Sequence, residues 1–314
     1  MTNKTIGVDL GGSHVLATVV EDGKILARVE HDIDDHAFES VFKLVASAID
    51  EALETTKKSI AAIGVGSPGN IDLTSGSVIY SPNFNWHDAP LGKRLFERYN
   101  MAVLVGNDAR CATLGEYSFG SGRGSRDFVL LTLGTGIGGG IVLGGNLALG
   151  NLGGAGEIGH HQIRATDGFV CNCGKTGCFE AQASGTGLIR HTLALGPSFP
   201  RSSLLTGKLG SKAIRRAAEA GDPHGMAAWT RFIDDLARGI ANVIGFVNPE
   251  TIALGGGVAG AGSFMLEALL PRVDALTTMV PKGRTRIVVA ELGNDAGAIG
   301  AATMARRGGL IASS

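Results

Sequence analysis

The sequence has almost no net charge. Its 314 residues include 28 Lys and Arg and 29 Asp and Glu, which leaves a formal net charge of −1. Surfaces that bind nucleic acid or anionic membranes usually carry an excess of basic residues. We therefore expect neither nucleic acid nor a membrane among the partners of this protein.

A secretion signal and a long apolar helix are also missing. The first residues, MTNKTIGVDLGGS, contain no basic region followed by an apolar core and a cleavage site, so we expect a cytoplasmic protein. Residues 128–156 have no charged side chain, as a membrane segment would. Their run LGTGIGGGIVLGG is too rich in glycine for a helix, and it predicts two short strands joined by a loop.

Cysteine is scarce and unevenly placed. The chain has four cysteines, and three of them lie between positions 171 and 178. Thiols stay reduced in the cytosol, where clustered cysteines are more often metal ligands than disulfides. The fourth, Cys111, lies on a predicted apolar helix, and we expect it to belong to the core.

Glycine, in contrast, is abundant and follows a plan that occurs twice. In each half of the chain a strand runs into a glycine turn and a hairpin, and further strands alternate with amphipathic helices. Strands are predicted within 4–13, 60–69, 101–109, 127–140, 249–259 and 285–296, and helices at 39–56, 90–100, 226–247 and 262–276. Asp22-Gly23 is the predicted turn of the first hairpin.

This internal duplication predicts an α/β protein with two lobes of similar topology that face each other across a cleft. The predicted small N-terminal lobe spans residues 1–115 and is joined by a C-terminal helix at 296–314. The predicted large lobe spans residues 116–295.

Three glycine turns are candidate nucleotide-binding loops, because bare backbone lets N–H groups approach phosphate oxygens closely. The alternative is that each tight turn simply needs glycine. None is a Walker A sequence, since no Gly-Lys-Ser/Thr follows. Asp9, beside the first loop, could hold Mg²⁺ through water. The candidate loop residues are Gly11, Gly12, Ser13, Gly134, Thr135, Gly136, Gly256 and Gly257.

Asn107-Asp108 ends a predicted strand of the first half. A carboxylate at the C-terminal end of a buried strand is placed to accept a proton from a substrate hydroxyl. The alternative for Asp108 is a helix N-cap, which aspartate supplies well. The corresponding pair in the second half, Asn294-Asp295, is interpreted as an N-cap only.

The remaining cysteines form a candidate metal site. Cys171, Cys173 and Cys178, with His160 upstream, make a Cys₃His set of the kind that binds structural zinc tetrahedrally. The spacing is not that of a zinc finger, and the even charge argues against a nucleic-acid-binding ribbon. Gly174 and Gly177 suit a tight knuckle around the metal.

Taken together, these motifs resemble those of the ROK family of sugar kinases and repressors. The matching segments are DLGGS, GEIGH, CNCGKTGCFE, LGTGIGGGIV and NDAGAIGAA, which are spread over the whole chain. The resemblance implies a two-lobed actin-like (ribonuclease H-like) sugar kinase fold with duplicated lobes and a zinc knuckle at 157–180. It also places His160 in the metal position and leaves His161 outside.

The resemblance further implies where a hexose and ATP would bind. Asp108 would be the catalytic base for a hexose C6 hydroxyl, and ATP with Mg²⁺ would lie between the first two glycine loops. Zn²⁺ would be structural, and the protein would be a dimer or tetramer. The candidate substrate-binding residues are Asn83, Asn107, Asp108, Glu157, His160 and Glu180.

The segment SPNFNWHDAPL at 81–91 resembles the corresponding loop of ROK glucokinases, so glucose is the expected substrate. Kinases of N-acetylglucosamine, N-acetylmannosamine, fructose or allose share the core motifs and are alternatives. A non-catalytic sugar-sensing regulator is an alternative of another class. Because the first strand begins by residue 5, we expect no DNA-binding domain ahead of it.

Two positions depart from the family pattern. Ser13-His14 stands where the family usually has Thr-Lys, which keeps the hydroxyl and loses a positive charge. Arg110 stands where an Asn is common, and it could bring a cation near the cleft or face solvent.

Overall fold

The computed structural model describes residues 4–56, 59–151 and 153–310. The chain forms two compact units: unit 1 comprises 1–126, 140–156 and 291–314, and unit 2 comprises 127–139 and 157–290. The lobe boundaries expected from the sequence stay a prediction, and residues 311–314 of the expected terminal helix lie outside the described residues.

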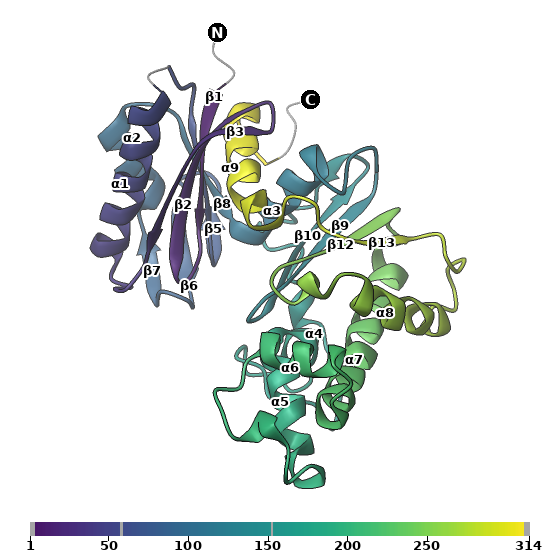
Figure 1. Cartoon of the computed structure of the whole chain (residues 1–314). Helices are drawn as coiled ribbons and strands as arrows, with labels where there is room; N and C mark the ends of the chain where they lie inside the picture. The colour runs from purple at the N-terminus through teal and green to yellow at the C-terminus, as the bar shows by residue number, and fades with distance from the viewer. Residues whose placement is uncertain (1–3, 57–58, 152, 311–314) are drawn as a thin grey trace. The chain divides into compact units, whose positions relative to one another are not determined.

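The first five-stranded sheet belongs to unit 1 and has the order β3-β2-β1-β4-β8 (Figure 1). Its strands are β1 (Lys4–Leu10), β2 (His14–Glu21), β3 (Lys24–Asp32), β4 (Ile63–Ser67) and β8 (Val103–Asn107). The first three strands are antiparallel, whereas β4 runs parallel to both β1 and β8. The β2–β3 turn is at Asp22 and Gly23, whose φ angles of 48° and 78° are those of a tight hairpin turn, as predicted.

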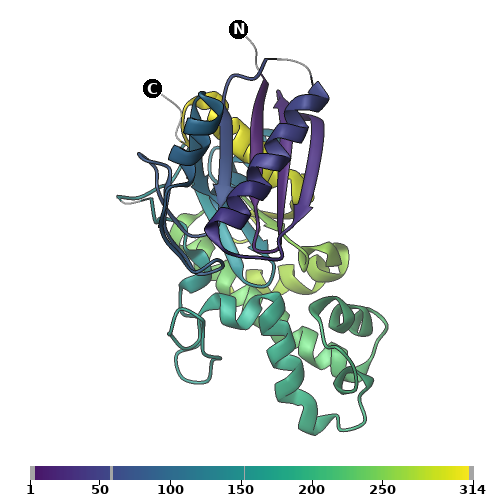
Figure 2. The ribbon, with the colours of Figure 1, turned by 90° about the vertical axis from the view of Figure 1, so that its left-hand side faces the viewer.

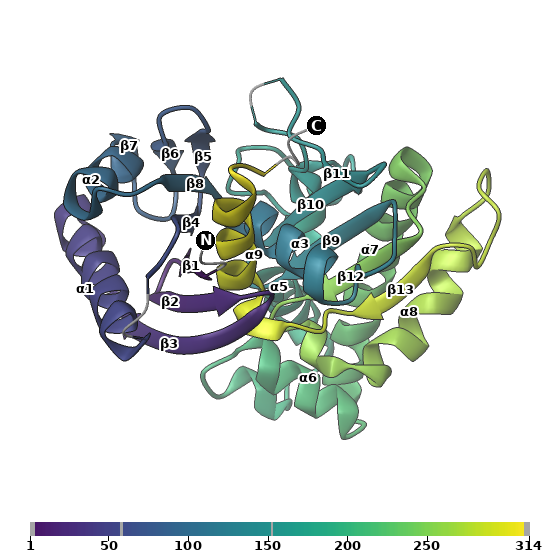
Figure 3. The same cartoon turned by 90° about the horizontal axis from the view of Figure 1, so that it is seen from above.

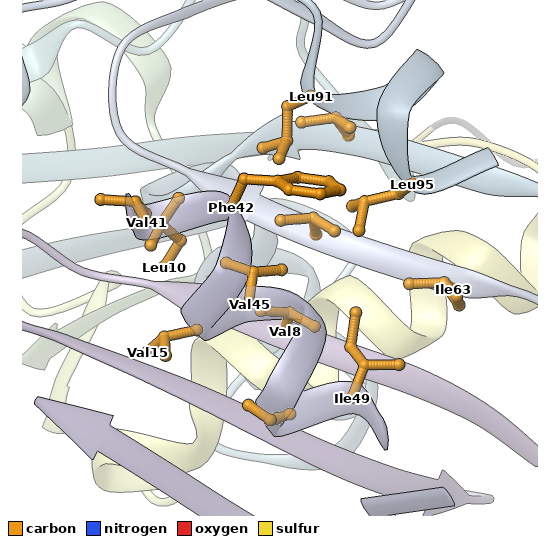
Figure 4. Close-up of a cluster of buried hydrophobic side chains, with 14 of the residues drawn as sticks. Val8, Leu10, Val15, Val41, Phe42, Val45, Ile49, Ile63, Leu91 and Leu95 are labelled. Atoms are coloured by element: carbon orange, nitrogen blue, oxygen red, sulfur yellow. The ribbon is translucent and has the colours of Figure 1, made fainter. Parts of the chain in front are cut away.

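One face of this sheet is covered by α1 (Phe38–Thr56), which lies across the strands in Figure 2. Val41, Val45 and Ile49 recur at helical spacing and are fully buried. Their side chains meet those of the strands and of α2 (Leu91–Tyr99) in one apolar cluster (Figure 4). Burial of this stripe fixes α1 on the sheet, because each such side chain contributes about 1.5–3 kcal/mol.

The opposite face is covered by α9 (Ala296–Arg307), as Figure 3 shows. The helix approaches β1 and β4 closely because Gly7 and Gly64 have no side chains. A Cβ at Gly64 would overlap the backbone oxygen of Ala301. Helix α3 (Asp108–Phe119) packs against α9. A small sheet of β5 (Asn70–Asp72), β6 (Ser77–Ser81) and β7 (Trp86–Ala89) contributes Ile71, Val78 and Trp86 to the apolar cluster that contains the buried stripe of α1.

The second five-stranded sheet has the order β11-β10-β9-β12-β13. Its strands are β9 (Phe128–Leu133), β10 (Ile137–Leu143), β11 (Asn146–Leu147), β12 (Thr251–Gly255) and β13 (Arg286–Val289). As in the first sheet, a hairpin leads into parallel pairs, here β9–β12 and β12–β13. The protein is therefore an α/β protein with two mixed sheets of the same strand order.

The helices of unit 2 gather around α7 (Pro223–Val247), which contacts α4, α5, α6 and α8. These are α4 (Phe179–Ala183), α5 (Gly185–Leu195), α6 (Ser211–Glu219) and α8 (Ser263–Leu276). Short 3₁₀ helices occur at Ile158–His160 (η1), Gly196–Ser198 (η2), Ser203–Leu205 (η3), Ala259–Ala261 (η4) and Gly293–Asp295 (η5). Among the described residues, none of the helices has the length and apolar character needed to cross a membrane.

Candidate functional site

The candidate residues fall into two sets, one in each unit, and each set is described by itself. In unit 1 the turn after β1 is closed by a hydrogen bond from Gly11 N to His14 O of 2.9 Å. Ser13 Oγ lies 3.3 Å from His14 Nδ1. A Cβ at Gly12 would lie 3.2 Å from Asn83 Nδ2, so this exposed asparagine borders the turn. The structure thus brings a candidate hexose residue beside a candidate phosphate loop.

Asp9 and Asp108 interact electrostatically within unit 1. Burial, and secondarily the negative charge of Asp108, raises the pKa of Asp9 to about 7. The Asp9 carboxylate lies against Gly297 in the first turn of α9, where any Cβ would overlap it. Two carboxylates that disfavour each other's charge are a suitable surrounding for a hydrated divalent cation, which would relieve the repulsion.

Asn107, not Asp108, is the N-cap of α3. Asn107 Oδ1 accepts a hydrogen bond from Arg110 N of 3.2 Å, and Asn107 Nδ2 donates to Gly69 O over 3.2 Å. Asp108 lies in the first helical turn, where its Oδ1 accepts from Ala109 N over 2.8 Å. The capping alternative proposed for Asp108 is therefore wrong.

The N-cap expected in the second half is found by position but not by its hydrogen bond. Asp295 occupies the N-cap position of α9 but makes no side-chain capping bond. Its Oδ1 lies 3.4 Å from Arg28 Nε instead. Arg110 does not face solvent: it is 4% exposed, and its Nε donates to Ala155 O over 2.9 Å.

In unit 2 the loop after β9 is held by hydrogen bonds from the first two residues of α5. Gly134 O accepts from Gly185 N over 2.8 Å, and Thr135 O accepts from Thr186 Oγ1 over 2.8 Å. Among the described residues, no atom lies within 4 Å of a Cβ built at Gly134, so this position is open to a ligand.

Gly136 has a different reason to be glycine. A Cβ there would overlap the carboxylate of Glu180, whose Oε2 accepts from Ile137 N over 2.9 Å. The backbone of a candidate phosphate loop therefore orients a candidate hexose-binding carboxylate. The role of Ile137 could not be predicted from the sequence, because a backbone N–H leaves no trace in residue identity.

The third glycine turn supports both of its interpretations. Gly256 has a φ of 81°, and a Cβ there would lie 2.6 Å from Leu133 O, so the turn itself requires glycine. Gly257, in contrast, has no described atom within 4 Å of its Cβ position. Only Gly257 is thus left with space for a ligand.

The four candidate metal ligands lie together in unit 2, with their ligand atoms within 4.8 Å of one another. Cys171 Sγ is 3.7 Å from His160 Nδ1, and Cys173 Sγ is 3.6 Å from Cys178 Sγ. Tetrahedral zinc, with Zn–S of about 2.3 Å and Zn–N of about 2.0 Å, requires about 3.8 Å between sulfurs and about 3.5 Å between sulfur and nitrogen. The donor set and its spacing therefore fit zinc.

The predicted knuckle glycines have the backbone that such a loop needs. Gly174 and Gly177 have φ angles of 89° and 76°, which L side chains rarely adopt. His161 lies outside the ligand set: its Nδ1 is 2.6 Å from Ile158 O, and burial lowers the pKa of its imidazole.

The candidate hexose residues of unit 2 adjoin this ligand set. Glu157 directly precedes η1, and its backbone oxygen accepts from His160 N over 3.1 Å. Glu180 follows Cys178 by two positions, and its Oε1 is 3.7 Å from Cys171 Sγ. Nδ1 of His160 faces the sulfurs, so Nε2, the other ring nitrogen, is not needed for the ligand set.

The ROK family model matches residues 5–308, and the chain belongs to this family. The chain is 40% identical over 310 residues to the glucokinase of Thermotoga maritima, covering 96% of each chain. It is 36% identical over 305 residues to the glucokinase of Halalkalibacterium halodurans, covering 94% of this chain and 92% of the relative. Among solved structures, the ROK family glucokinase of Streptomyces griseus in complex with glucose and AMPPNP superposes with a TM-score of 0.84 at 33% identity, covering 96% and 99% of the two chains.

Proposed function

We propose that this protein is an ATP-dependent glucokinase, an ATP:hexose 6-phosphotransferase that converts glucose and ATP to glucose 6-phosphate and ADP. The observation that carries this proposal is the likeness to glucokinases along nearly the whole chain, at 36–40% identity. The solved relative with bound glucose and AMPPNP supports the same pair of substrates.

The hexose is proposed to bind through hydroxyl-accepting and hydroxyl-donating side chains. Carboxylates accept two hydroxyl protons in fork geometry when they are held rigidly, as Glu180 is by Ile137 N. Asp108 takes the C6 hydroxyl proton while that oxygen forms its bond to the γ-phosphorus and ADP leaves. The proposed contacts are Asn83, Asn107, Asp108, Glu157, His160 and Glu180.

The nucleotide is proposed to bind through the backbone of the glycine turns, with Asp9 near its Mg²⁺. Phosphoryl transfer depends mainly on positioning and charge neutralisation. Loops whose backbone N–H groups bind the phosphate oxygens can supply both. The proposed residues are Gly11, Gly12 and Ser13 in unit 1, and Gly134, Thr135, Gly136, Gly256 and Gly257 in unit 2.

Zinc is proposed to be held by His160, Cys171, Cys173 and Cys178, and its role is structural. Metal at Nδ1 fixes the imidazole ring, so Nε2 is presented to a sugar hydroxyl in one orientation. The 3.7 Å spacing between His160 Nδ1 and Cys171 Sγ supports this assignment.

A dimer or tetramer and a cytoplasmic location remain part of the proposal.

The test is a coupled assay of ADP release with purified protein and a panel of hexoses. Glucose should give the highest kcat/KM, above mannose, fructose, allose, N-acetylglucosamine and N-acetylmannosamine. If another hexose is phosphorylated with a higher kcat/KM, the protein is still a hexose kinase, but glucose is not its preferred substrate. Hexose binding by calorimetry with no ADP release from any of them would support the non-catalytic sensor instead.

A further inference from the structure

Helix α7 carries a carboxylate in the interior of unit 2. Asp235 is 0% exposed, yet none of the proposed hexose, nucleotide or metal residues is among its partners. Its Oδ1 accepts from Arg164 Nε over 2.8 Å and from Arg238 Nη1 over 3.1 Å. Its Oδ2 lies 3.2 Å from His191 Nε2. A buried charge is tolerated only when it is paired in this way, and removing one partner is strongly destabilising.

Arg164 belongs to the segment that carries the candidate metal ligands. The backbone N–H groups of Ile163 and Arg164 donate to Gly177 O over 2.8 and 3.2 Å. A Cβ at Gly177 would overlap Arg164 O, so the two backbones are in direct contact. Gly177 immediately precedes Cys178. Asp235 therefore reaches Cys178 through one guanidinium and one pair of backbone hydrogen bonds.

A second contact from α7 is made to Phe179, the residue that follows Cys178. Gly239 lies one helical turn after Asp235, so the two share a face of α7. The ring of Phe179 lies against Gly239, and a Cβ there would overlap it. Since Phe179 stands between Cys178 and Glu180, this contact positions a candidate ligand and a candidate hexose carboxylate together.

The imidazole beside Asp235 extends the same connection. The ring of His191 lies 5.0 Å from the ring of Phe169. Phe169 packs against Cys171 and Cys178, and its backbone oxygen accepts from Gly177 N over 2.9 Å. Two neighbours of Asp235, its hydrogen-bond partner Arg164 and the adjacent ring of His191, thus approach the ligand segment at separate points.

We infer that Asp235 is a positioning residue, whose buried carboxylate acts through Arg164 to preset the metal ligands and Glu180 for hexose binding. This inference rests on the proposed function. The planar guanidinium fork holds its partners in a fixed geometry, whereas a lysine would not. Residues that orient metal ligands typically change metal affinity by about 10–100-fold when they are replaced.

The test compares Asp235→Asn with Asp234→Asn in the full-length, metal-loaded protein. Asp234 is the adjacent residue of α7 and also has an ion-pair partner, since its Oδ1 accepts from Arg272 Nε over 2.7 Å. Its partner lies on α8, away from the ligand segment. The pair of variants therefore separates the loss of an α7 charge from the loss of the contact to Arg164.

Zinc release to a chromogenic chelator is the first measurement, at a temperature where both variants are folded by circular dichroism. Asp235→Asn should release zinc about 10-fold faster than the wild type, at the low end for a residue that acts through another. Its KM for glucose should rise while its KM for ATP stays unchanged. Asp234→Asn should match the wild type in all three values.

Arg164→Met provides a second route if Asp235→Asn does not fold, because the Arg164 side chain is 25% exposed and easier to replace. It should also release zinc faster, and Arg164→Lys should restore part of the loss. Where the double variant folds, combining it with Asp235→Asn should add little, since both remove one interaction.

The outcomes separate this inference from the proposed function. Wild-type protein that contains zinc and phosphorylates glucose, together with variants that release zinc at the wild-type rate, would overturn the inference alone. A lower melting temperature with unchanged zinc release and unchanged KM for glucose would also overturn it, because Asp235 would then be only a structural residue. Wild-type protein that binds no zinc would overturn the proposed metal site and the inference together.

Discussion

Asp9 and Asp108 lie in the same unit but have different surroundings. Asp9 is at the end of a buried strand, and its pKa is raised to about 7 by burial and by the charge of Asp108. Asp108 is in the first turn of α3, where the helix dipole and the N–H of Ala109 stabilise a negative charge. The two carboxyl groups therefore suit two tasks. Asp9 is suited to binding a cation, and Asp108 is suited to accepting a proton.

Asp108→Asn should retain glucose binding and lose turnover. The amide keeps the size and the hydrogen bond from Ala109 N but cannot take the hydroxyl proton, so kcat should fall by about 10²-fold or more. Coupled kinetics would measure kcat, and calorimetry would measure glucose affinity. Asp295→Asn, at the corresponding position of the second half, is the matched control and should keep its kcat. Turnover close to the wild-type value in Asp108→Asn would remove it from the base role.

The raised pKa of Asp9 predicts a pH-dependent stability of the protein without Mg²⁺ and nucleotide. Folding favours the protonated form of Asp9. Its contribution to the free energy of unfolding is therefore fully present below about pH 4 and is lost as the pH rises through about 7. Asp9→Asn should therefore gain stability relative to the wild type between pH 4.5 and 8, on the order of 1–3 kcal/mol.

Urea unfolding at pH 4.5, 6 and 8 measures this difference. The control is Asp32→Asn, at an exposed position of β3, which should follow the wild type at every pH. Parallel curves for Asp9→Asn and the wild type would mean that the Asp9 carboxyl is not perturbed by folding.

At the scale of elements, α1, α7, α8 and the hairpins could be predicted, whereas α5 and the small sheet could not. The Asp22-Gly23 turn and the helical spacing of Val41, Val45 and Ile49 are local signals, and both are found as expected. Strands β5, β6 and β7 have only 3, 5 and 4 residues, and their polar stretches show no clear alternation. Short strands of this kind are specified by their pairing, which a sequence pattern does not show.

The same division applies to the candidate site. The Cys₃His set could be predicted because its ligands lie within a short stretch, 160–178. The contact between Gly136 and Glu180 could not, since the two are distant in sequence and one partner is a backbone position. The pairing of Arg164 with Asp235 is more distant still, and only the fold brings them together.

Because α9 packs closely on the first sheet, a single added methyl group at Gly64 should lower the stability of the protein strongly. Gly64→Ala would place Cβ against Ala301 O, a backbone atom that cannot move without shifting the helix. Overpacking of this kind should destabilise the protein by about 3 kcal/mol, the upper end of the usual range. Urea unfolding would measure the loss, with Gly207→Ala as the control because no described atom lies within 4 Å of its Cβ position. Equal stability of the two variants would contradict the close approach.

At the scale of the whole molecule, the candidate metal ligands and two hexose carboxylates belong to one unit. Cys173→Ser should therefore lose zinc and glucose affinity together. Cys173 is an exposed ligand, so the substitution leaves no cavity in the core. Metal content and glucose calorimetry are the measurements. Cys111→Ala, in the core of unit 1, is the control that should retain zinc, and full glucose affinity in zinc-free Cys173→Ser would contradict the coupling.

Removing the metal should also loosen only one of the two units. The first sheet lies in unit 1, whereas the four candidate ligands lie in unit 2 alone. Local openings are confined to cooperative segments when their contacts are local. Hydrogen exchange after chelation should therefore speed up in 157–183 and in the part of α7 near Asp235 and Gly239, while β1, β4 and β8 keep their protection. A uniform loss of protection in both sheets would show that the metal stabilises the whole chain. The contacts of Asp235 and Gly239 on α7 would then not be the route by which zinc acts.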